Sequence, residues 1–139
     1  MKEVCVPAQI NKFDDLLLVL DRELERAGCP RKVIMQMDIA FEEMYVNVAH
    51  YAYPEENISG EGKVKIKFDV SESDKSVTIT LDDEGKEFDP LAKPDPDVTL
   101  SADERAIGGL GIYMVKKSMD KVSYERKDGH NIFIMTKGW

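Results

Sequence analysis

Residues 63–70 follow a strict alternation that strongly limits how this segment can fold. The apolar side chains at every second position are Val64, Ile66, Phe68 and Val70, and between them lie Lys63, Lys65, Lys67 and Asp69. This pattern predicts a β-strand with one buried face and one face in water. Residues 77–82 repeat the alternation after a polar turn at residues 71–76. The two segments therefore predict neighbouring strands of a sheet with an apolar face to be covered.

Two amphipathic helices are expected before these strands. Between residues 11 and 27 the apolar positions recur in steps of three and four, at Phe13, Leu16, Leu17, Leu20 and Leu24. Gly28 ends this helix and Pro30 starts the next, which runs to about residue 52. Its apolar stripe is Val33, Met37, Phe41, Met44 and Val48. Residues 2–7 predict an edge strand ahead of both helices.

The second half of the chain is expected to contain a long loop, one helix and two strands. Residues 86–107 lack periodicity and contain three prolines, and loops of this length are often functional lids. Residues 108–119 resume helical spacing with Leu110, Met114 and Val115. Residues 122–126 and 131–137 then predict two closing strands, joined by a hairpin turn at residues 127–129.

The predicted order of elements indicates an α/β (α+β) fold. The simplest arrangement is a two-layer sandwich in which helices pack on one face of a mixed, mostly antiparallel sheet. A length of 139 residues suits a single domain, residues 1–139, with one core.

Composition excludes several classes of function. The formal net charge of −8 argues against direct nucleic-acid binding, which needs a basic face. No apolar run is long enough for a membrane span, and residues 1–8 lack the apolar core of a signal peptide. Cys5 and Cys29 fit neither a disulfide framework nor a metal site, so we expect two buried thiols in a cytoplasmic protein.

Glu43 and Asn47 lie one turn apart on the second predicted helix, outside its apolar stripe. An asparagine carbonyl can be the protein's oxygen ligand to Mg²⁺. A carboxylate one turn away can accept a proton from an attacking hydroxyl or water. Taken alone, the pair is better explained as an ordinary solvated helix face.

Asp83 ends a predicted strand and Gly85 follows it. The carboxylate could accept a hydrogen bond from an adenine amino group, and the glycine could let a ligand approach the backbone. Taken alone, these two residues are better explained as a turn.

Gly109 and Gly111 stand at the start of the third predicted helix. Exposed backbone N–H groups and the positive end of the helix dipole favour an anion there. The segment lacks the Lys-Ser/Thr of a P-loop and does not follow a strand, so it fits neither that motif nor a Rossmann fingerprint. A flexible hinge is an equal alternative.

The three motifs together resemble the N, G1 and G2 boxes of the GHKL (Bergerat-fold) ATPases. The matching segments are Glu43-x-x-x-Asn47, Asp83-x-Gly85-x-x-Phe88-Asp89-Pro90 and Gly109-x-Gly111, in that order. Residues 42–52 and 105–120 are most similar to the small anti-sigma-factor serine kinases of bacteria. The likeness covers nearly the whole chain.

This resemblance implies ATP and Mg²⁺ as cofactors and assigns a role to each motif. The implied roles are Glu43 as catalytic base, Asn47 as Mg²⁺ ligand, Asp83 as adenine acceptor with Gly85 beside it, and Gly109 and Gly111 along the phosphates. Residues 86–108 would form an ATP lid. Arg105 would neutralise phosphate or meet a partner protein, and a solvated charge is an equal alternative. Family members often carry Gly-Thr where this chain has Gly129-His130-Asn131, so Asn131 is a candidate replacement for the threonine. His50 is expected to pack in the interior.

The implied activity is that of an ATP-dependent serine/threonine protein kinase. Its substrate would be a small anti-anti-sigma-like protein in a partner switch, with a sigma factor as a second partner and a homodimer as an open question. One alternative is a nucleotide-dependent module that sequesters a partner with little catalysis. Another is the catalytic domain of a histidine kinase.

Overall fold

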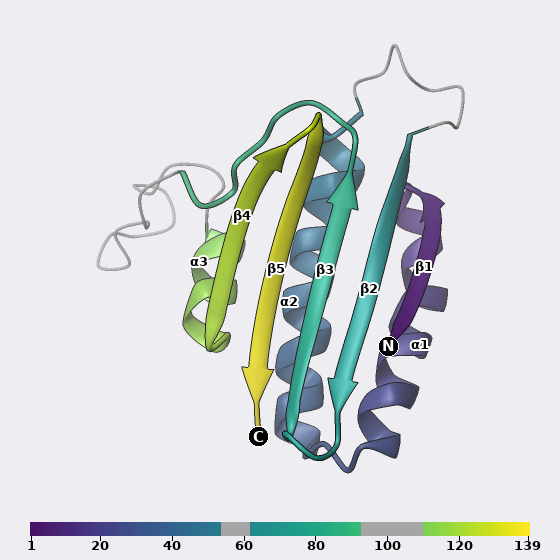
Figure 1. Ribbon diagram of the computed structural model, residues 1–139, viewed down its shortest axis with the longest axis vertical. Coiled ribbons are helices and arrows are strands. Elements are labelled where there is room, and N and C mark those ends of the chain that lie inside the picture. Colours follow the sequence, from purple (N-terminus) through teal and green to yellow (C-terminus); the bar gives the residue numbers. More distant parts are fainter. Residues whose placement is uncertain (54–61, 93–109) are drawn as a thin grey trace.

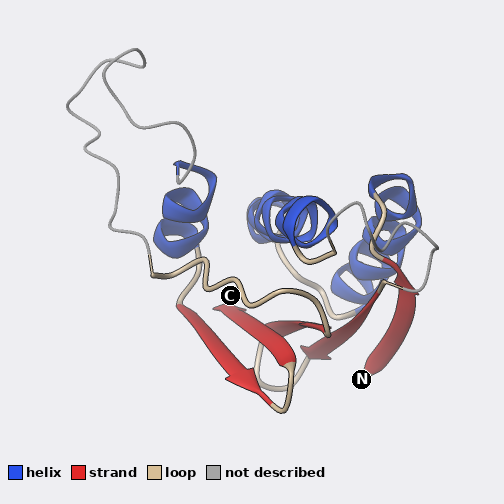
Figure 2. Ribbon diagram, turned by 90° about the horizontal axis from the view of Figure 1, so that it is seen from above, coloured by secondary structure: helices blue, strands red, loops and turns tan. Residues whose placement is uncertain are grey.

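The computed structural model describes residues 1–53, 62–92 and 110–139. Within these residues the chain forms two layers, a five-stranded sheet with α-helices on one face (Figures 1 and 2). This arrangement confirms the predicted two-layer α/β fold. The expectations for Arg105, Gly109 and most of the loop between β3 and α3 lie outside the described residues.

The sheet brings the end of β3 beside the start of β5. Its strands are β1 (Lys2–Pro7), β2 (Lys63–Ser71), β3 (Ser76–Asp83), β4 (Lys121–Lys127) and β5 (His130–Gly138). They lie in the order β1-β2-β3-β5-β4, and each of these neighbouring pairs is antiparallel. In this register Asp83 is opposite Asn131. Two residues far apart in the sequence are thereby placed side by side.

The helices begin and end close to where the sequence indicates. They are the 3-10 turn η1 (Ile10–Lys12) and the helices α1 (Phe13–Arg26), α2 (Arg31–Tyr51) and α3 (Leu110–Ser118). Gly28 adopts φ of 74° after α1, a left-handed conformation that glycine adopts readily, and Pro30 caps α2 with extended backbone. Among the described residues, no helix is long and apolar enough to cross a membrane.

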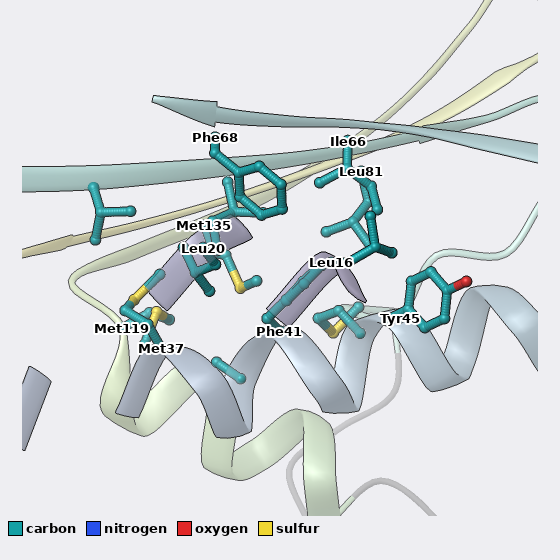
Figure 3. Close-up of a cluster of buried hydrophobic side chains, with 14 of the residues drawn as sticks. Leu16, Leu20, Met37, Phe41, Tyr45, Ile66, Phe68, Leu81, Met119 and Met135 are labelled. Carbon is teal, nitrogen blue, oxygen red and sulfur yellow. The ribbon is translucent and has the colours of Figure 1, made fainter. Parts of the chain in front are cut away.

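The core fills the space between the helices and the sheet (Figure 3). Its largest fully buried side chains come from α1, α2 and the three central strands, and include Leu16, Leu20, Met37, Phe41, Tyr45, Ile66, Phe68, Leu81 and Met135. Most residues of the two expected helix stripes are thus buried in this core, whereas Leu17 and Val48 are partly buried at its edge. Met114 departs from the pattern, because 53% of it is exposed on α3.

Two expectations about individual side chains are wrong. Cys5 is exposed, because Val4 and Val6 pack against the core and the alternation turns Cys5 to the other face of the sheet. His50 is exposed near the end of α2, with its ring at 6.1 Å from that of Tyr51. Cys29 is buried as expected, and burial raises the pKa of its thiol.

Asp21 on α1 and Asp38 on α2 form a carboxyl pair between the two helices. The Oδ1 atom of each is buried, and no N–H or O–H group in the described part of the chain donates a hydrogen bond to it. A proton shared between the two groups would give one of them a donor. Burial, with Asp21 as the second cause, raises the pKa of Asp38 to about 8, against an opposing effect of Arg31.

This pair predicts that the protein loses stability as the pH rises. The folded state holds a proton that the unfolded chain releases above a pKa of 3.8, so stability falls between about pH 4 and about pH 8. Asp38→Asn should flatten this slope and raise Tm at alkaline pH, because its amide can donate to Asp21. Thermal melts across this range test the effect, with the exposed Glu72→Gln as control. A wild-type Tm that rises over the same range would contradict it.

Candidate functional site

A pocket opens between the second half of α2 and the adjoining ends of β3 and β5. Its lining comes from α2, the strands and the loop after β3, and consists of Met44, Asn47, Val48, Ala52, Leu81, Asp83, Phe88, Pro90, Tyr124, Asn131 and Phe133. Most of these side chains are apolar, and a few polar groups converge among them. That combination is typical of small-molecule sites.

Asp83 is the polar group best placed to select a ligand. It is only 4% exposed, and its Oδ1 accepts hydrogen bonds of 2.9 Å from the Gly85 N–H and from Nδ2 of Asn131. Burial raises the pKa of the Asp83 carboxyl, and these two hydrogen bonds oppose the rise. No described residue donates to Oδ2. That oxygen can therefore accept a hydrogen bond from a donor that enters the pocket.

Asn131 links Asp83 to the loop that follows β3. Its Nδ2 also donates to the Lys86 carbonyl at 2.8 Å. Its Oδ1 accepts from the Tyr124 hydroxyl at 2.5 Å, from Arg126 Nη1 at 3.1 Å and from the Phe88 N–H at 3.3 Å. These partners fix the orientation of the amide and occupy both of its ends. Asn131 therefore supports Asp83 and the loop.

Gly85 is required by packing against the end of α2. The position of a Cβ atom on this residue is already filled by the backbone of Ala52. The Ala52 carbonyl also accepts a 2.7 Å hydrogen bond from the Lys86 N–H, and Arg126 Nη1 donates to the Gly85 carbonyl at 2.8 Å. These contacts hold the loop close to the helix. Close approach of a ligand to Gly85 stays a prediction.

Tyr51 and Phe88 form a second link between α2 and this loop. Their rings stack at 5.4 Å between centroids with 24° between the planes. Phe88 lines the pocket, whereas Tyr51 is 54% exposed. The stack therefore holds one wall of the pocket in place from outside.

Asn47 reaches the pocket from α2 with its amide oxygen available. Its Nδ2 donates to the Glu43 carbonyl one turn earlier, at 2.9 Å. This bond occupies the nitrogen end, so the oxygen is the end that can meet a ligand. A hard oxygen ligand beside a nucleotide pocket fits Mg²⁺, which takes few protein ligands and keeps waters and phosphates.

Glu43 lies against the start of α3. Its carboxylate occupies the position that a Cβ atom on Gly111 would need. The residue lines a groove between α2 and α3 together with Gln36, Ile39, Ala40, Gly111, Met114, Val115 and Ser118. The fold therefore places the first and third sequence motifs in contact.

The structure thus gathers the described site residues into two adjoining hollows. Asn47 and Asp83 line the pocket, Glu43 and Gly111 meet in the groove, and Gly85 lies behind the pocket wall. Sequence reasoning left the role of Asn131 open and did not single out Tyr124 or Arg126. These three residues could be assigned to the site only from the register of the strands, which sequence spacing alone does not provide.

Comparisons with known proteins show which family this chain resembles. A family model described as a histidine kinase-like ATPase domain matches residues 6–137. The serine-protein kinase RsbW of Bacillus subtilis (strain 168) is 32% identical over 141 residues, which cover 97% of this chain and 83% of that protein. RsbW of Staphylococcus aureus (strain bovine RF122 / ET3-1) is 32% identical over 139 residues, with 97% and 84% covered.

A solved structure supports the same fold. It contains the RsbU and RsbW domains of Rv1364c from Mycobacterium tuberculosis, and it matches 99% of this chain with a TM-score of 0.64 and 14% identity. The present chain spans about a third of that longer protein, 32% of its length. At this identity the match bears on the fold alone.

Proposed function

The chain belongs to the histidine kinase-like (GHKL) ATPase family, and we propose that it is a Mg-ATP-dependent serine/threonine protein kinase. The observation that carries the proposal is the Asp83 carboxylate, buried in a mostly apolar pocket with Oδ2 available. An adenine ring offers an apolar face and an amino donor, which match this lining. The relatives named serine-protein kinase favour serine over histidine as the acceptor.

Each motif would contribute one part of the reaction. Asp83 would accept from the adenine amino group, and Asn47 would offer its amide oxygen to Mg²⁺. When bound, Mg²⁺ would neutralise part of the negative charge of the phosphates. The N–H groups near Gly111, with Gly109 and Arg105 from outside the described residues, would bind the phosphates. Gly85 would lie beside the adenine.

Glu43 would act as the base for the acceptor hydroxyl. The hydroxyl oxygen forms a bond to the γ-phosphorus, the bond from that phosphorus to the β,γ-bridging oxygen breaks, and ADP leaves. The hydroxyl proton passes to the Glu43 carboxylate. The contact of Glu43 with Gly111 supports this role, because it places the carboxylate beside the proposed phosphate end of the site.

The acceptor would be a protein that docks over the groove between α2 and α3. Ile39 and Met114 beside Glu43 are 59% and 53% exposed, which favours an apolar contact with a partner. In line with the family resemblance, we propose a small anti-anti-sigma-like substrate and a sigma factor as second partner. We also propose a single cytoplasmic domain over residues 1–139, with homodimer formation to be tested.

Nucleotide binding is the first test. Mg-ADP at a hundred times its Kd should stabilise the nucleotide-free protein by about 2.7 kcal/mol. Thermal melts with ADP and either Mg²⁺ or EDTA measure the effect and its dependence on metal. Asn47→Ala should reduce the part that depends on Mg²⁺ and leave the ADP-only shift. A melting curve unchanged by millimolar Mg-ADP would exclude the proposed site.

The chemical class of the acceptor is tested separately. Incubation with labelled ATP and the co-purifying small partner should yield phosphoserine or phosphothreonine on that partner. Phosphohistidine alone would favour a histidine kinase-like domain instead.

A further inference from the structure

His130 binds two carboxylates at the end of β3, on the face of the sheet away from the pocket. Its Nδ1 is 2.6 Å from Oδ1 of Asp82, and its Nε2 is 3.2 Å from Oε1 of Glu84. Asp82 and Glu84 flank Asp83, whose own side chain lines the pocket on the opposite face. The first two residues of β5 therefore bind three consecutive acidic residues at the end of β3. His130 binds Asp82 and Glu84 on one face of the sheet, and Asn131 binds Asp83 on the other.

Glu84 connects this histidine to the pocket. Its backbone N–H donates to the Tyr53 hydroxyl at 2.9 Å, and that hydroxyl donates to the Lys63 carbonyl at 2.6 Å. The next residue, Gly85, supplies one of the two N–H groups that hold Asp83 Oδ1. A displacement of Glu84 would therefore move a group that orients Asp83.

The protonation state of His130 decides how many carboxylates it can hold. A neutral imidazole carries one N–H, so it can donate to Asp82 or to Glu84 but not to both. The imidazolium carries two and can donate to both. Loss of the proton therefore releases one carboxylate and leaves the negative charges of Asp82 and Glu84 without a nearby counter-charge from the histidine.

We infer that His130 is a positioning residue for the proposed nucleotide site, whose protonated form holds Glu84 and so keeps Asp83 oriented for adenine. The inference rests on the proposed function. It makes the affinity for ADP depend on pH through a residue that does not line the pocket.

The surroundings of His130 favour its charged form. The hydrogen bond with Asp82 is the main cause that raises its pKa, with smaller contributions from the charges of Asp82 and Glu84, while desolvation and Lys65 oppose the rise. A separate surface hollow surrounds His130. The other titratable groups that line it or face His130 in the strand register are Cys5, Tyr53, Lys63, Asp83 and Lys127.

The sign of the effect follows from the geometry, because only the protonated form of His130 can donate to both Asp82 and Glu84. Below the pKa of His130 the imidazolium holds both Asp82 and Glu84, and ADP binds more tightly. The affinity for ADP falls as the pH rises through that pKa. By linkage, ADP must raise the pKa of His130 in turn. Because the side chains of His130 and Glu84 are 35% and 74% exposed, water screens their interaction, and we expect a change in Kd of about two- to fivefold, the size typical of ion pairs at the surface.

Calorimetric titration of Mg-ADP between about pH 6 and pH 9 tests the inference. The wild type should show the two- to fivefold change. His130→Gln should bind with the weaker affinity throughout and with a smaller pH dependence. His130→Lys keeps a positive charge over this range and should retain the tighter binding at alkaline pH. The exposed His50→Gln is the matched control and should follow the wild type.

NMR adds a readout that a purely structural role would not move. The chain has two histidines, so His50→Gln leaves the ring signal of His130 alone in the spectrum. Its pKa should rise on addition of Mg-ADP. Two results would overturn the inference while ADP binding stands. One is a His130 pKa that Mg-ADP leaves unchanged, and the other is a His130→Gln variant whose affinity for Mg-ADP varies with pH as in the wild type. Absence of ADP binding at every pH would overturn the proposed function itself.

Discussion

Asp83→Asn is expected to weaken Mg-ADP binding by roughly 150-fold, the equivalent of about 3 kcal/mol for a lost hydrogen bond to a charged group. The carboxylate accepts on both oxygens, whereas an amide has one oxygen and one NH₂ group. The Gly85 N–H and Asn131 Nδ2 both donate to the present Oδ1 and hold the amide oxygen there. The amide NH₂ would then face the incoming adenine amino group, donor against donor.

The same substitution should leave the fold intact. Asp83 is buried with a raised pKa, so its charge is a cost to the folded state that asparagine does not carry. The matched control is Asp69→Asn, on an exposed position of β2, which should bind ADP like the wild type. Calorimetry measures affinity and a melt without ligand checks folding. Wild-type affinity in a folded Asp83→Asn protein would mean that adenine does not bind at this carboxylate.

The two layers of this fold could be predicted from the sequence, because strand alternation and helical apolar stripes both indicate directly which side chains are buried. Alternation in residues 63–70 and the stripe of α2 identify side chains that must leave water, and Phe68 and Phe41 meet in the core at 5.5 Å between ring centroids. Met114 shows the limit of the argument. Its spacing fits a buried helix face, but it lies beside a groove with no described residue to cover it.

The candidate site was predictable only in part, because its supporting contacts depend on strand register. Asp83 and Asn131 are 48 positions apart and become partners only when β5 pairs with β3. The clamp of His130 on Asp82 depends on the same pairing. Gly85 illustrates a different limit. Its sequence context suggests close approach of a ligand or a turn, whereas the group that excludes a side chain in the fold is the backbone of Ala52, just after α2.

Glu43→Gln is expected to slow phosphoryl transfer to the partner by about 10²–10⁴-fold, the usual contribution of a general base. Glutamine keeps the shape of the side chain against Gly111 but cannot take the acceptor proton. The affinity for Mg-ADP should stay near the wild-type value, because Asp83 and Asn47 are unchanged. Single-turnover transfer from labelled ATP, measured beside calorimetry, separates the two effects.

Glu42→Gln is the matched control for this test. Glu42 is adjacent on α2 and exposed, and it lines neither the pocket nor the groove that contains Glu43. The same loss of charge there should leave transfer unchanged, which separates a general-base role from the effect of the net charge of the helix. If Glu43→Gln transfers phosphate as fast as Glu42→Gln, the carboxylate has no part in proton transfer. If neither variant nor the wild type transfers phosphate, yet all three bind Mg-ADP and the partner, the exposed groove beside Glu43 acts in sequestration.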